Sequence, residues 1–254
     1  MRKFLFYLIL LISIFIPLNT FAIDIDENDF EVVAQEEKYY KTVTVINNNM
    51  SSIMSIYNYD SNSITEEITK EEYDSFIESN ISTNGSITLE TNYKKLTTSI
   101  LSNGSYYRYK AVLNWKNMPK VRSYDTIAIG YYASVKPRGL LNFSQSYCMT
   151  DGSCEISTSY YPHTFTAGSS ATFGLPDESL TSLSQTFYFD VQKAVDSTII
   201  EQNASGDYAH AVKSISYTNA QKYTVSNTGI HFDSSVENYF DEINYVRVTW
   251  KGSW

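Results

Sequence analysis

The chain has 254 residues and a formal net charge of −9, with 28 Asp and Glu against 19 Lys and Arg. A nucleic-acid partner requires a basic face that neutralises phosphates, so this composition argues against one. The three histidines and two cysteines lack the spacing of a metal site, and no cofactor motif is present, so we expect neither a metal nor a cofactor.

The first 22 residues have the pattern of a secretory signal peptide. Arg2 and Lys3 form a basic start, Phe4–Leu18 is an apolar run, and a polar stretch ends at Ala22. The run of about 15 apolar residues is shorter than the roughly 20 that a spanning helix needs. We therefore expect a secreted or surface-associated protein with no transmembrane segment after signal removal. Retention of residues 1–22 as an anchor is the alternative.

The remaining charge is divided unevenly. Residues 23–90 hold 15 acidic and 3 basic residues, a net charge of −12, whereas residues 91–254 hold 13 acidic and 14 basic residues, a net charge of +1. Such asymmetry suggests two units. We expect an acidic accessory segment or pro-region over 23–90 and a separate domain over 91–254.

The acidic segment predicts a few short elements. In chain order we expect a disordered lead-in, a strand, a hairpin and a helix, over 23–37, 38–46, 53–68 and 70–78. Thr69 followed by Glu72 is a capping box that starts the helix. The polar residues 79–86 are expected to be a linker.

From residue 91 the hydrophobic pattern has a period of two. The strands expected are 93–101, 105–115, 125–135, 140–148, 154–160, 164–173, 185–191, 207–217 and 243–250, with a helical piece over 236–240. Asn103-Gly104 is a strong hairpin signal between the first two strands. Alternation puts Tyr107, Tyr109, Ala111, Leu113 and Trp115 on one face. The sequence therefore predicts a mainly β fold, an antiparallel β-sandwich.

The two cysteines lie in one predicted hairpin. A three-residue loop over 150–152, with Gly152 in a left-handed conformation, pairs Met149 with Ser153 and places Cys148 opposite Cys154. An exported chain meets oxidising conditions, so we expect a disulfide bond between Cys148 and Cys154. A pair of buried free thiols is the alternative.

No catalytic residue is assigned, and an enzyme is the less favoured interpretation. His163, His210 and His231 lie in different predicted elements, and no nucleophile motif accompanies them. Alternation puts His210 on the same face as Tyr208. If that face is buried, we expect a hydroxyl partner for His210 and no open cleft beside it.

Aromatic residues are unusually frequent, with 22 Tyr and 3 Trp. Tyrosine doublets recur at 39–40, 106–107, 131–132 and 160–161, and in a strand one member of each must face away from the core. Outward tyrosines suit a cell-wall polymer or a protein partner; strand propensity alone is the competing explanation. We therefore expect a non-catalytic binding protein, with an exported hydrolase or a membrane-active β-protein as alternatives.

Several short segments carry a family resemblance: 93–95, 106–108, 113–119, 122–125, 127–130, 147–148 with Cys154, 206–210 and 250–254. Through them, residues 93–254 resemble a family of exported proteins of Gram-positive bacteria with no assigned activity. The resemblance implies an exported β-rich domain with a paired cysteine. It implies no catalytic or binding residue.

Overall fold

The computed structural model describes residues 29–47, 62–75, 83–84, 87–241 and 245–254. Contacts divide the chain into Met1–Phe30 and Glu31–Trp254. The expected signal peptide lies outside the described residues, and every strand named below belongs to the second unit.

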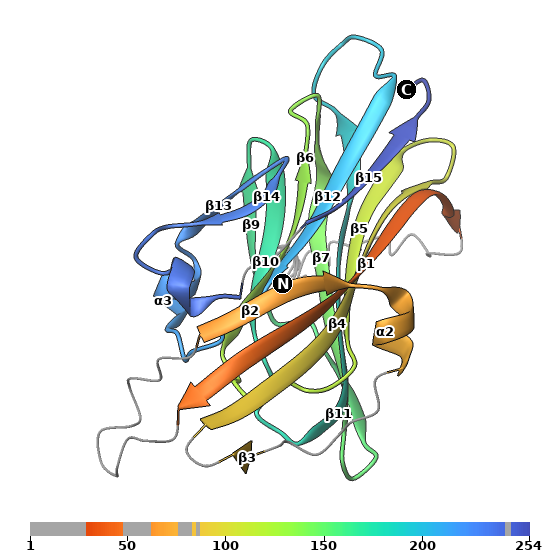
Figure 1. Cartoon of the computed structure of the whole chain (residues 1–254). Coiled ribbons are helices and arrows are strands. Elements are labelled where there is room, and N and C mark those ends of the chain that lie inside the picture. The colour runs from red at the N-terminus through yellow and green to blue at the C-terminus, as the bar shows by residue number, and fades with distance from the viewer. Residues whose placement is uncertain (1–28, 48–61, 76–82, 85–86, 242–244) are drawn as a thin grey trace, which may run out of the picture. The chain divides into compact units, whose positions relative to one another are not determined.

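Within the described residues, the second unit has two large antiparallel sheets and a two-stranded one (Figure 1). The larger sheet runs β2 (Asn62–Ile68), β1 (Glu31–Asn47), β4 (Ile87–Ser102), β5 (Tyr107–Trp115), β11 (Leu180–Lys193), β7 (Val135–Met149) and β8 (Cys154–Ser157), with β3 (Thr83–Asn84) on β4. The smaller sheet runs β15 (Val246–Lys251), β12 (Glu201–Ala209), β6 (Tyr124–Tyr131), β10 (Gly168–Gly174) and β9 (Tyr161–Phe165). The predicted mainly β, antiparallel sandwich is confirmed.

The core between the sheets follows the period-two pattern. The five inward residues predicted for β5, from Tyr107 to Trp115, are all buried, as are Ile127, Ile129 and Tyr131 on β6. Residues of both sheets form one apolar cluster, because each strand turns every second side chain toward the other sheet.

A third layer covers the outer face of the smaller sheet. It consists of β13 (Tyr223–Ser226), β14 (Gly229–Phe232), α3 (Tyr217–Ala220) and η2 (Glu237–Tyr239). The sheet presents small residues here, including Ala128, Ala209 and Ala211. A Cβ atom on Gly130 would lie 2.1 Å from the backbone oxygen of Ser226, so only glycine lets the hairpin approach this closely.

The prediction of a disordered lead-in is wrong for residues 31–37, which belong to β1. This strand pairs with β4 along nearly its whole length. The Glu37 carboxylate accepts hydrogen bonds from Lys95 at 3.4 Å and from Thr97 at 3.3 Å. Pairing with a distant polar strand compensates for the low hydrophobicity of the segment, and local sequence carries no sign of that partner.

The acidic segment therefore shares a sheet with the sandwich. Its second strand, β2, pairs with β1, and the 53–59 strand that we expected as its partner lies outside the described residues. The helix α2 (Lys70–Ser75) begins as predicted, since the Glu72 N–H donates to the Thr69 hydroxyl at 3.1 Å. Removal of residues 23–90 as a pro-region stays a prediction.

Other strand predictions also need correction. The strand expected over 125–135 ends at Tyr131, and a turn leads into β7. The 164–173 strand is two strands, β9 and β10. The 207–217 strand is β12, which lies earlier in the chain, and the expected 243–250 strand is β15, which begins at Val246. The hairpin β13–β14 has no counterpart in the prediction.

The cysteine hairpin is confirmed. Cys148 is bridged to Cys154 with Cα atoms 4.0 Å apart, and the Met149 N–H donates to the Ser153 oxygen at 2.8 Å. Gly152 has φ of 88°, the left-handed conformation that the three-residue loop requires.

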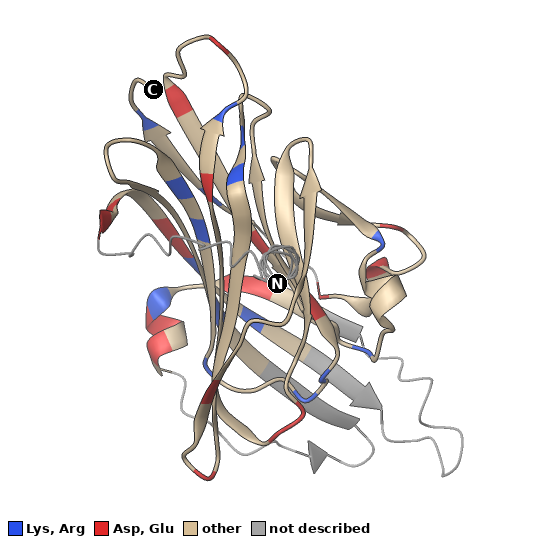
Figure 2. Ribbon diagram, turned by 180° about the vertical axis from the view of Figure 1, so that it is seen from behind, with Lys and Arg blue, Asp and Glu red and all other residues tan. Residues whose placement is uncertain are grey.

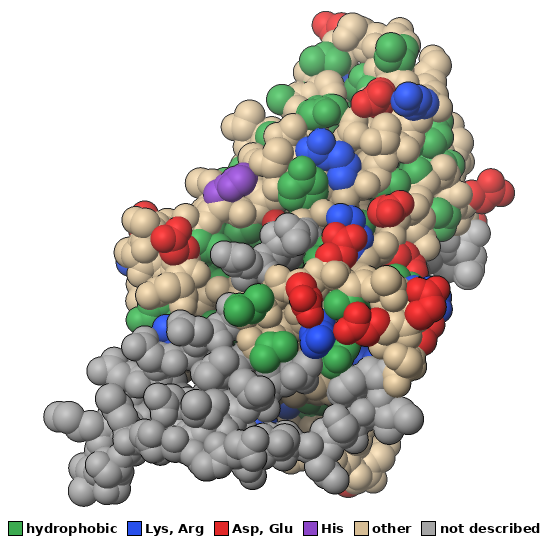
Figure 3. All heavy atoms as spheres, in the orientation of Figure 1, with side chains coloured by type: hydrophobic (Ala, Val, Ile, Leu, Met, Phe, Trp, Pro, Cys, Tyr) green, Lys and Arg blue, Asp and Glu red, His purple; other side chains and the backbone are tan. Residues whose placement is uncertain are grey.

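Charged residues are concentrated on the larger sheet and on α2, whereas the β9–β10 hairpin has no Asp, Glu, Lys or Arg (Figure 2). Figure 3 shows Asp and Glu side chains gathered over β1, β2 and α2. Lysines interleave with them, including Lys38 at 2.9 Å from Glu67 and Lys41 at 3.2 Å from Glu66. These exposed pairs lower the local repulsion but add little stability.

Candidate functional site

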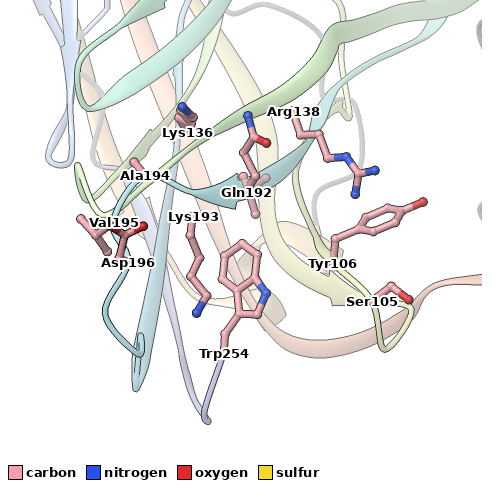
Figure 4. A pocket seen from close by; sticks show the side chains of 11 residues that line it. Ser105, Tyr106, Lys136, Arg138, Gln192, Lys193, Ala194, Val195, Asp196 and Trp254 are labelled. Carbon is pink, nitrogen blue, oxygen red and sulfur yellow. The ribbon is translucent and has the colours of Figure 1, made fainter.

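A groove with a volume of about 610 Å³ lies where the β4–β5 turn, the start of β7, the end of β11 and the C-terminal residue meet. The residues that line it include Tyr106, Lys136, Arg138, Lys193, Asp196 and Trp254 (Figure 4). Three cations and one carboxylate therefore line the groove, together with two flat aromatic rings. Such a surface attracts an anionic ligand that carries ring-shaped groups.

The sheet register positions the cations of β7. Lys136 lies opposite Gln192 and Arg138 opposite Asp190, so all four share the outer face of the sheet. A bulge follows Arg138, at Gly139 with φ of 77°. Bulges of this kind redirect the neighbouring side chain.

Arg138 is held against an aromatic ring. Its guanidinium carbon lies 4.5 Å from the ring centre of Tyr106, a cation–π contact. Asp190, the carboxylate opposite Arg138, instead accepts a hydrogen bond from Nε of Arg108 at 2.8 Å. The carboxylate charge is thus matched by Arg108, and the exposed Arg138 faces the groove with its positive charge.

The tyrosine doublets divide between core and surface as the alternation predicts. Tyr40, Tyr107 and Tyr131 are buried, while Tyr39 and Tyr106 are partly exposed and Tyr132 is 39% exposed. The outward tyrosines do not form one surface. Tyr39 packs on Tyr73, Tyr106 lies in the groove, and Tyr161 packs on Tyr217. Only the 106–107 doublet adds an aromatic ring to the groove.

His210 faces the interior and is 3% exposed. Its Nδ1 lies 3.0 Å from a carboxylate oxygen of Asp125, and its ring packs edge-on against Trp115 at 5.1 Å. The prediction of a hydroxyl partner is therefore wrong. The reason is register: β12 pairs with β6, and this pairing brings a carboxylate 85 residues away to the same face.

The Asp125 carboxylate is the centre of a buried polar cluster. It also accepts hydrogen bonds from the Ala211 N–H at 2.9 Å and from the Tyr208 hydroxyl. Burial and the Asp125 charge raise the pKa of Tyr208 well above its ordinary value, so its hydroxyl stays a donor. These contacts fix His210 as part of the packing between β6 and β12.

The other histidines lie elsewhere. His163 on β9 packs near Phe165 and Tyr223, and burial lowers its pKa. His231 on β14 is exposed, and its Nε2 lies 2.8 Å from the Ser226 hydroxyl. The structure therefore does not bring the three histidines together.

Two features of the described residues bear on the kind of site. Among them, no group of three or more His, Cys, Asp or Glu side chains is placed to hold a metal ion. No helix in the described ranges is long and apolar enough to cross a membrane.

Sequence reasoning did not find the groove. Its cations come from β7 and β11, which are adjacent only in the folded sheet, and its rings come from the β4–β5 turn and the C-terminal residue. The one local signal was Tyr106, as a doublet member. Lys136, Arg138 and Lys193 look like ordinary solvated strand residues when read along the chain.

Comparison with known proteins gives no family. No family model and no curated protein matches the chain. Similar solved structures include the major pilin SpaD from Corynebacterium diphtheriae, at 10% identity, TM-score 0.29 and coverage of 68% of this chain. The collagen-binding domain of the Erysipelothrix rhusiopathiae surface protein RspB matches at 9% identity and TM-score 0.30, covering 68% of this chain and 73% of that one.

A third similar structure is the C-terminal domain of the Streptococcus agalactiae AgI/II polypeptide BspA, at 6% identity and TM-score 0.29, covering 82% of this chain and 84% of that one. This chain spans 56% of the pilin's length. At these TM-scores the likenesses define neither fold nor function. We therefore infer function from the geometry of the groove.

Proposed function

We propose that this protein is exported and binds an anionic cell-wall polymer through the groove lined by Tyr106, Lys136, Arg138, Lys193 and Trp254. Export is supported by the signal-like start of the sequence, and it agrees with the family of exported proteins that residues 93–254 resemble. The observation that carries the proposal is the grouping of three cations and two aromatic rings in one open groove. A protein partner and a hydrolase have no comparable feature in their favour.

The chemistry of the groove explains the choice of a charged polymer. Lys136 and Lys193 offer point charges on flexible stems, and Arg138 offers a planar fork that pairs with carboxylate or phosphate oxygens. Tyr106 and Trp254 supply flat faces of the kind that stack on sugar rings. A repeating polymer that carries one acidic group per sugar-like unit would meet both kinds of contact at once.

The acidic surface over β1, β2 and α2 does not prevent this binding. Charges in solution are screened beyond about 8 Å at physiological ionic strength. Within the acidic region, lysines such as Lys38 and Lys41 also pair with their glutamate neighbours. The positive charge of the groove itself therefore decides which ligands approach it.

Co-sedimentation of the mature protein with purified Gram-positive cell walls tests the proposal. We expect binding to intact walls and its loss from walls stripped of their anionic polymers. The variant Lys136→Ala/Arg138→Ala/Lys193→Ala should lose at least tenfold in affinity, about 1.4 kcal/mol.

A control variant that removes two cations elsewhere on the surface separates the groove from general electrostatics. The variant Lys213→Ala/Lys222→Ala removes cations near α3 and β13, away from the groove, and should bind like the unmodified protein. Equal binding by the groove variant, or equal loss in the control, would show that the groove is not the binding site.

A further inference from the structure

A lysine and an aspartate lie in direct contact in the protein interior. Lys94 is on β4, and Asp241 follows η2 and lies 147 residues later in the chain. Nζ of Lys94 contacts Oδ2 of Asp241, and the two side chains are 3% and 0% exposed. A buried ion pair loses the hydration of both charges, so as a simple pair it is weak evidence of a stabilising role.

Aromatic side chains surround the pair. Nζ of Lys94 lies 5.3 Å from the ring centre of Trp115 and 5.8 Å from that of Tyr208. Trp115 on β5 and Tyr40 on β1 flank Lys94 in the sheet register, and both are buried. The rings keep water away from the amine and the carboxyl group.

Nζ of Lys94 and Oδ2 of Asp241 are in direct contact, so a proton can pass from one to the other with no third group between them. Transfer of one proton from the ammonium to the carboxylate turns the ion pair into an amine and a carboxylic acid with no change in net charge. A neutral, desolvated lysine amine is a nucleophile. Its target, Cγ of Asp241, is already within contact range, so the reaction is unimolecular.

The carboxyl group of Asp241 is also held for attack. The backbone N–H of His210 donates to Oδ1 at 3.0 Å, and the backbone N–H of Asp241 donates to the His210 oxygen at 3.0 Å. The Thr42 hydroxyl lies 3.4 Å from Oδ2. The His210 N–H thus points at the oxygen on which negative charge develops when an amine attacks Cγ.

The buried Asp125 cluster supports this arrangement. Asp125 binds the ring of His210 at 3.0 Å and accepts the hydroxyl of Tyr208, whose ring covers Lys94. Asp125 therefore fixes the position of His210, whose N–H donates to Oδ1 of Asp241, and of the Tyr208 ring that covers Lys94. Asp125 is a positioning residue here, since it reaches the pair through His210 and Tyr208.

We propose that Lys94 and Asp241 condense to form an intramolecular amide bond. The amine lone pair attacks Cγ, the N–Cγ bond forms and the Cγ–Oδ2 bond breaks. Of the three ammonium protons, one stays on the amide nitrogen and two leave with Oδ2 as water. The reaction needs no oxidant, reductant or other reactant, and the dry site protects the product from hydrolysis.

The product would link β4 of the larger sheet to the segment that leads into β15 of the smaller sheet. It would close a loop of 147 residues, far longer than the loop that the disulfide closes. A crosslink across both sheets resists separation of the sandwich under a pulling force, which suits a protein held at a cell surface.

Mass spectrometry of the reduced, full-length mature protein tests this. We expect an intact mass lower by one water than the sequence from the observed N-terminal residue requires. Protease digestion should yield one joined peptide that contains Lys94 and Asp241. An unchanged mass with two separate peptides would overturn the proposal. So would a mass loss without the joined peptide, because an aspartate that cyclises onto its own backbone also loses water.

Variants identify the reacting atoms. Lys94→Arg keeps a positive charge but removes the amine, so it should retain the full sequence mass. Its neighbour Lys95, half-buried and 3.4 Å from Glu37, gives the matched control Lys95→Arg, which should still lose one water. Asp241→Asn preserves the shape of the site and should release ammonia instead, ending at the mass of the reacted wild type. If Asp241→Asn keeps its full sequence mass, the assignment is refuted even where Lys94→Arg fails to fold.

Discussion

At the scale of single residues, buried polar groups rather than exposed ones organise this protein. The Asp125 carboxylate contacts the His210 ring and accepts hydrogen bonds from the Ala211 N–H and the Tyr208 hydroxyl. All three partners lie within residues 208–211, at the end of β12, so the carboxylate fixes the position of that stretch against β6. An unpaired polar group at this depth would be costly, which makes every member of the cluster sensitive to substitution.

His210→Ala should therefore lower the free energy of unfolding by about 2–4 kcal/mol, because it removes a buried hydrogen bond and leaves a cavity beside Trp115. Urea unfolding followed by tryptophan fluorescence measures the change. His231→Ala is the control: this histidine is exposed, and its loss should cost less than about 1 kcal/mol. Similar costs for the two variants would contradict the role given to His210.

Gly206 illustrates how closely the two sheets pack. A Cβ atom there would lie 2.1 Å from the hydroxyl oxygen of Thr98 on β4. Gly206→Ala should cost about 1–3 kcal/mol through overpacking. Thr98→Ala removes the obstructing hydroxyl, so the double variant should recover part of the loss. Strict additivity in thermal unfolding would argue against this contact.

At the scale of elements, the β13–β14 hairpin depends on one buried carboxylate. Asp207 on β12 accepts the Ile230 N–H at 2.7 Å and the Tyr208 N–H at 2.8 Å. Burial raises the pKa of Asp207 to about 7, and the two N–H donors only partly oppose this. The attachment of the hairpin to the smaller sheet is therefore coupled to a proton.

Protonation of Asp207 stabilises the folded protein. The folded-state pKa of Asp207 lies above its ordinary value of 3.8, so its contribution to stability is complete below about pH 4 and is lost as the pH rises through about 7. Between these limits Asp207 lowers the free energy of unfolding by at most about 1.4 kcal/mol per pH unit. Asp207→Asn should flatten this slope in denaturant unfolding.

Asp233 provides the comparison for that measurement. It is exposed, and its hydrogen bonds to Ser235 lower its pKa, so Asp233→Asn should leave the slope between pH 4 and 7 unchanged. A slope that survives in the Asp207 variant would mean that another group carries the titration.

The element scale also shows what sequence alone could predict. Alternation identified the inward face of β5, and Asn103-Gly104 and the cysteine loop identified two hairpins, because these signals are local. The start of β1 was missed, since its charged residues are accommodated only by pairing with β4. The hairpin β13–β14 was missed because its strands have only four residues each.

At the scale of the whole molecule, sites assembled from distant segments were beyond reach of the sequence. The groove combines four segments, and the pair Lys94 and Asp241 spans 147 residues. Neither the groove nor this pair has a sequence motif. Strand pairing and the stacking of the two sheets bring their residues together, and spacing along the chain does not. The disulfide is the opposite case, with a separation of six residues within one hairpin.

The short loop predicts that the disulfide contributes little to the free energy of unfolding. Closing so short a loop restricts the unfolded chain only slightly, so reduction should cost about 2 kcal/mol or less. Thermal unfolding with and without a reducing agent tests this, with Cys148→Ser/Cys154→Ser as an independent version. A collapse of the fold on reduction would show that the hairpin matters far more than its loop length implies.

The salt dependence of ligand binding tests the central claim, a groove for an anionic polymer, most directly. The affinity of the mature protein for the purified polymer should fall linearly on a plot of log K against log salt concentration, because binding releases counterions from the polyanion. The variant Lys136→Ala/Arg138→Ala/Lys193→Ala should give a slope smaller by about two to three, one for each lost contact. Binding that does not respond to salt, or a variant with the same slope as the unmodified protein, would contradict the account.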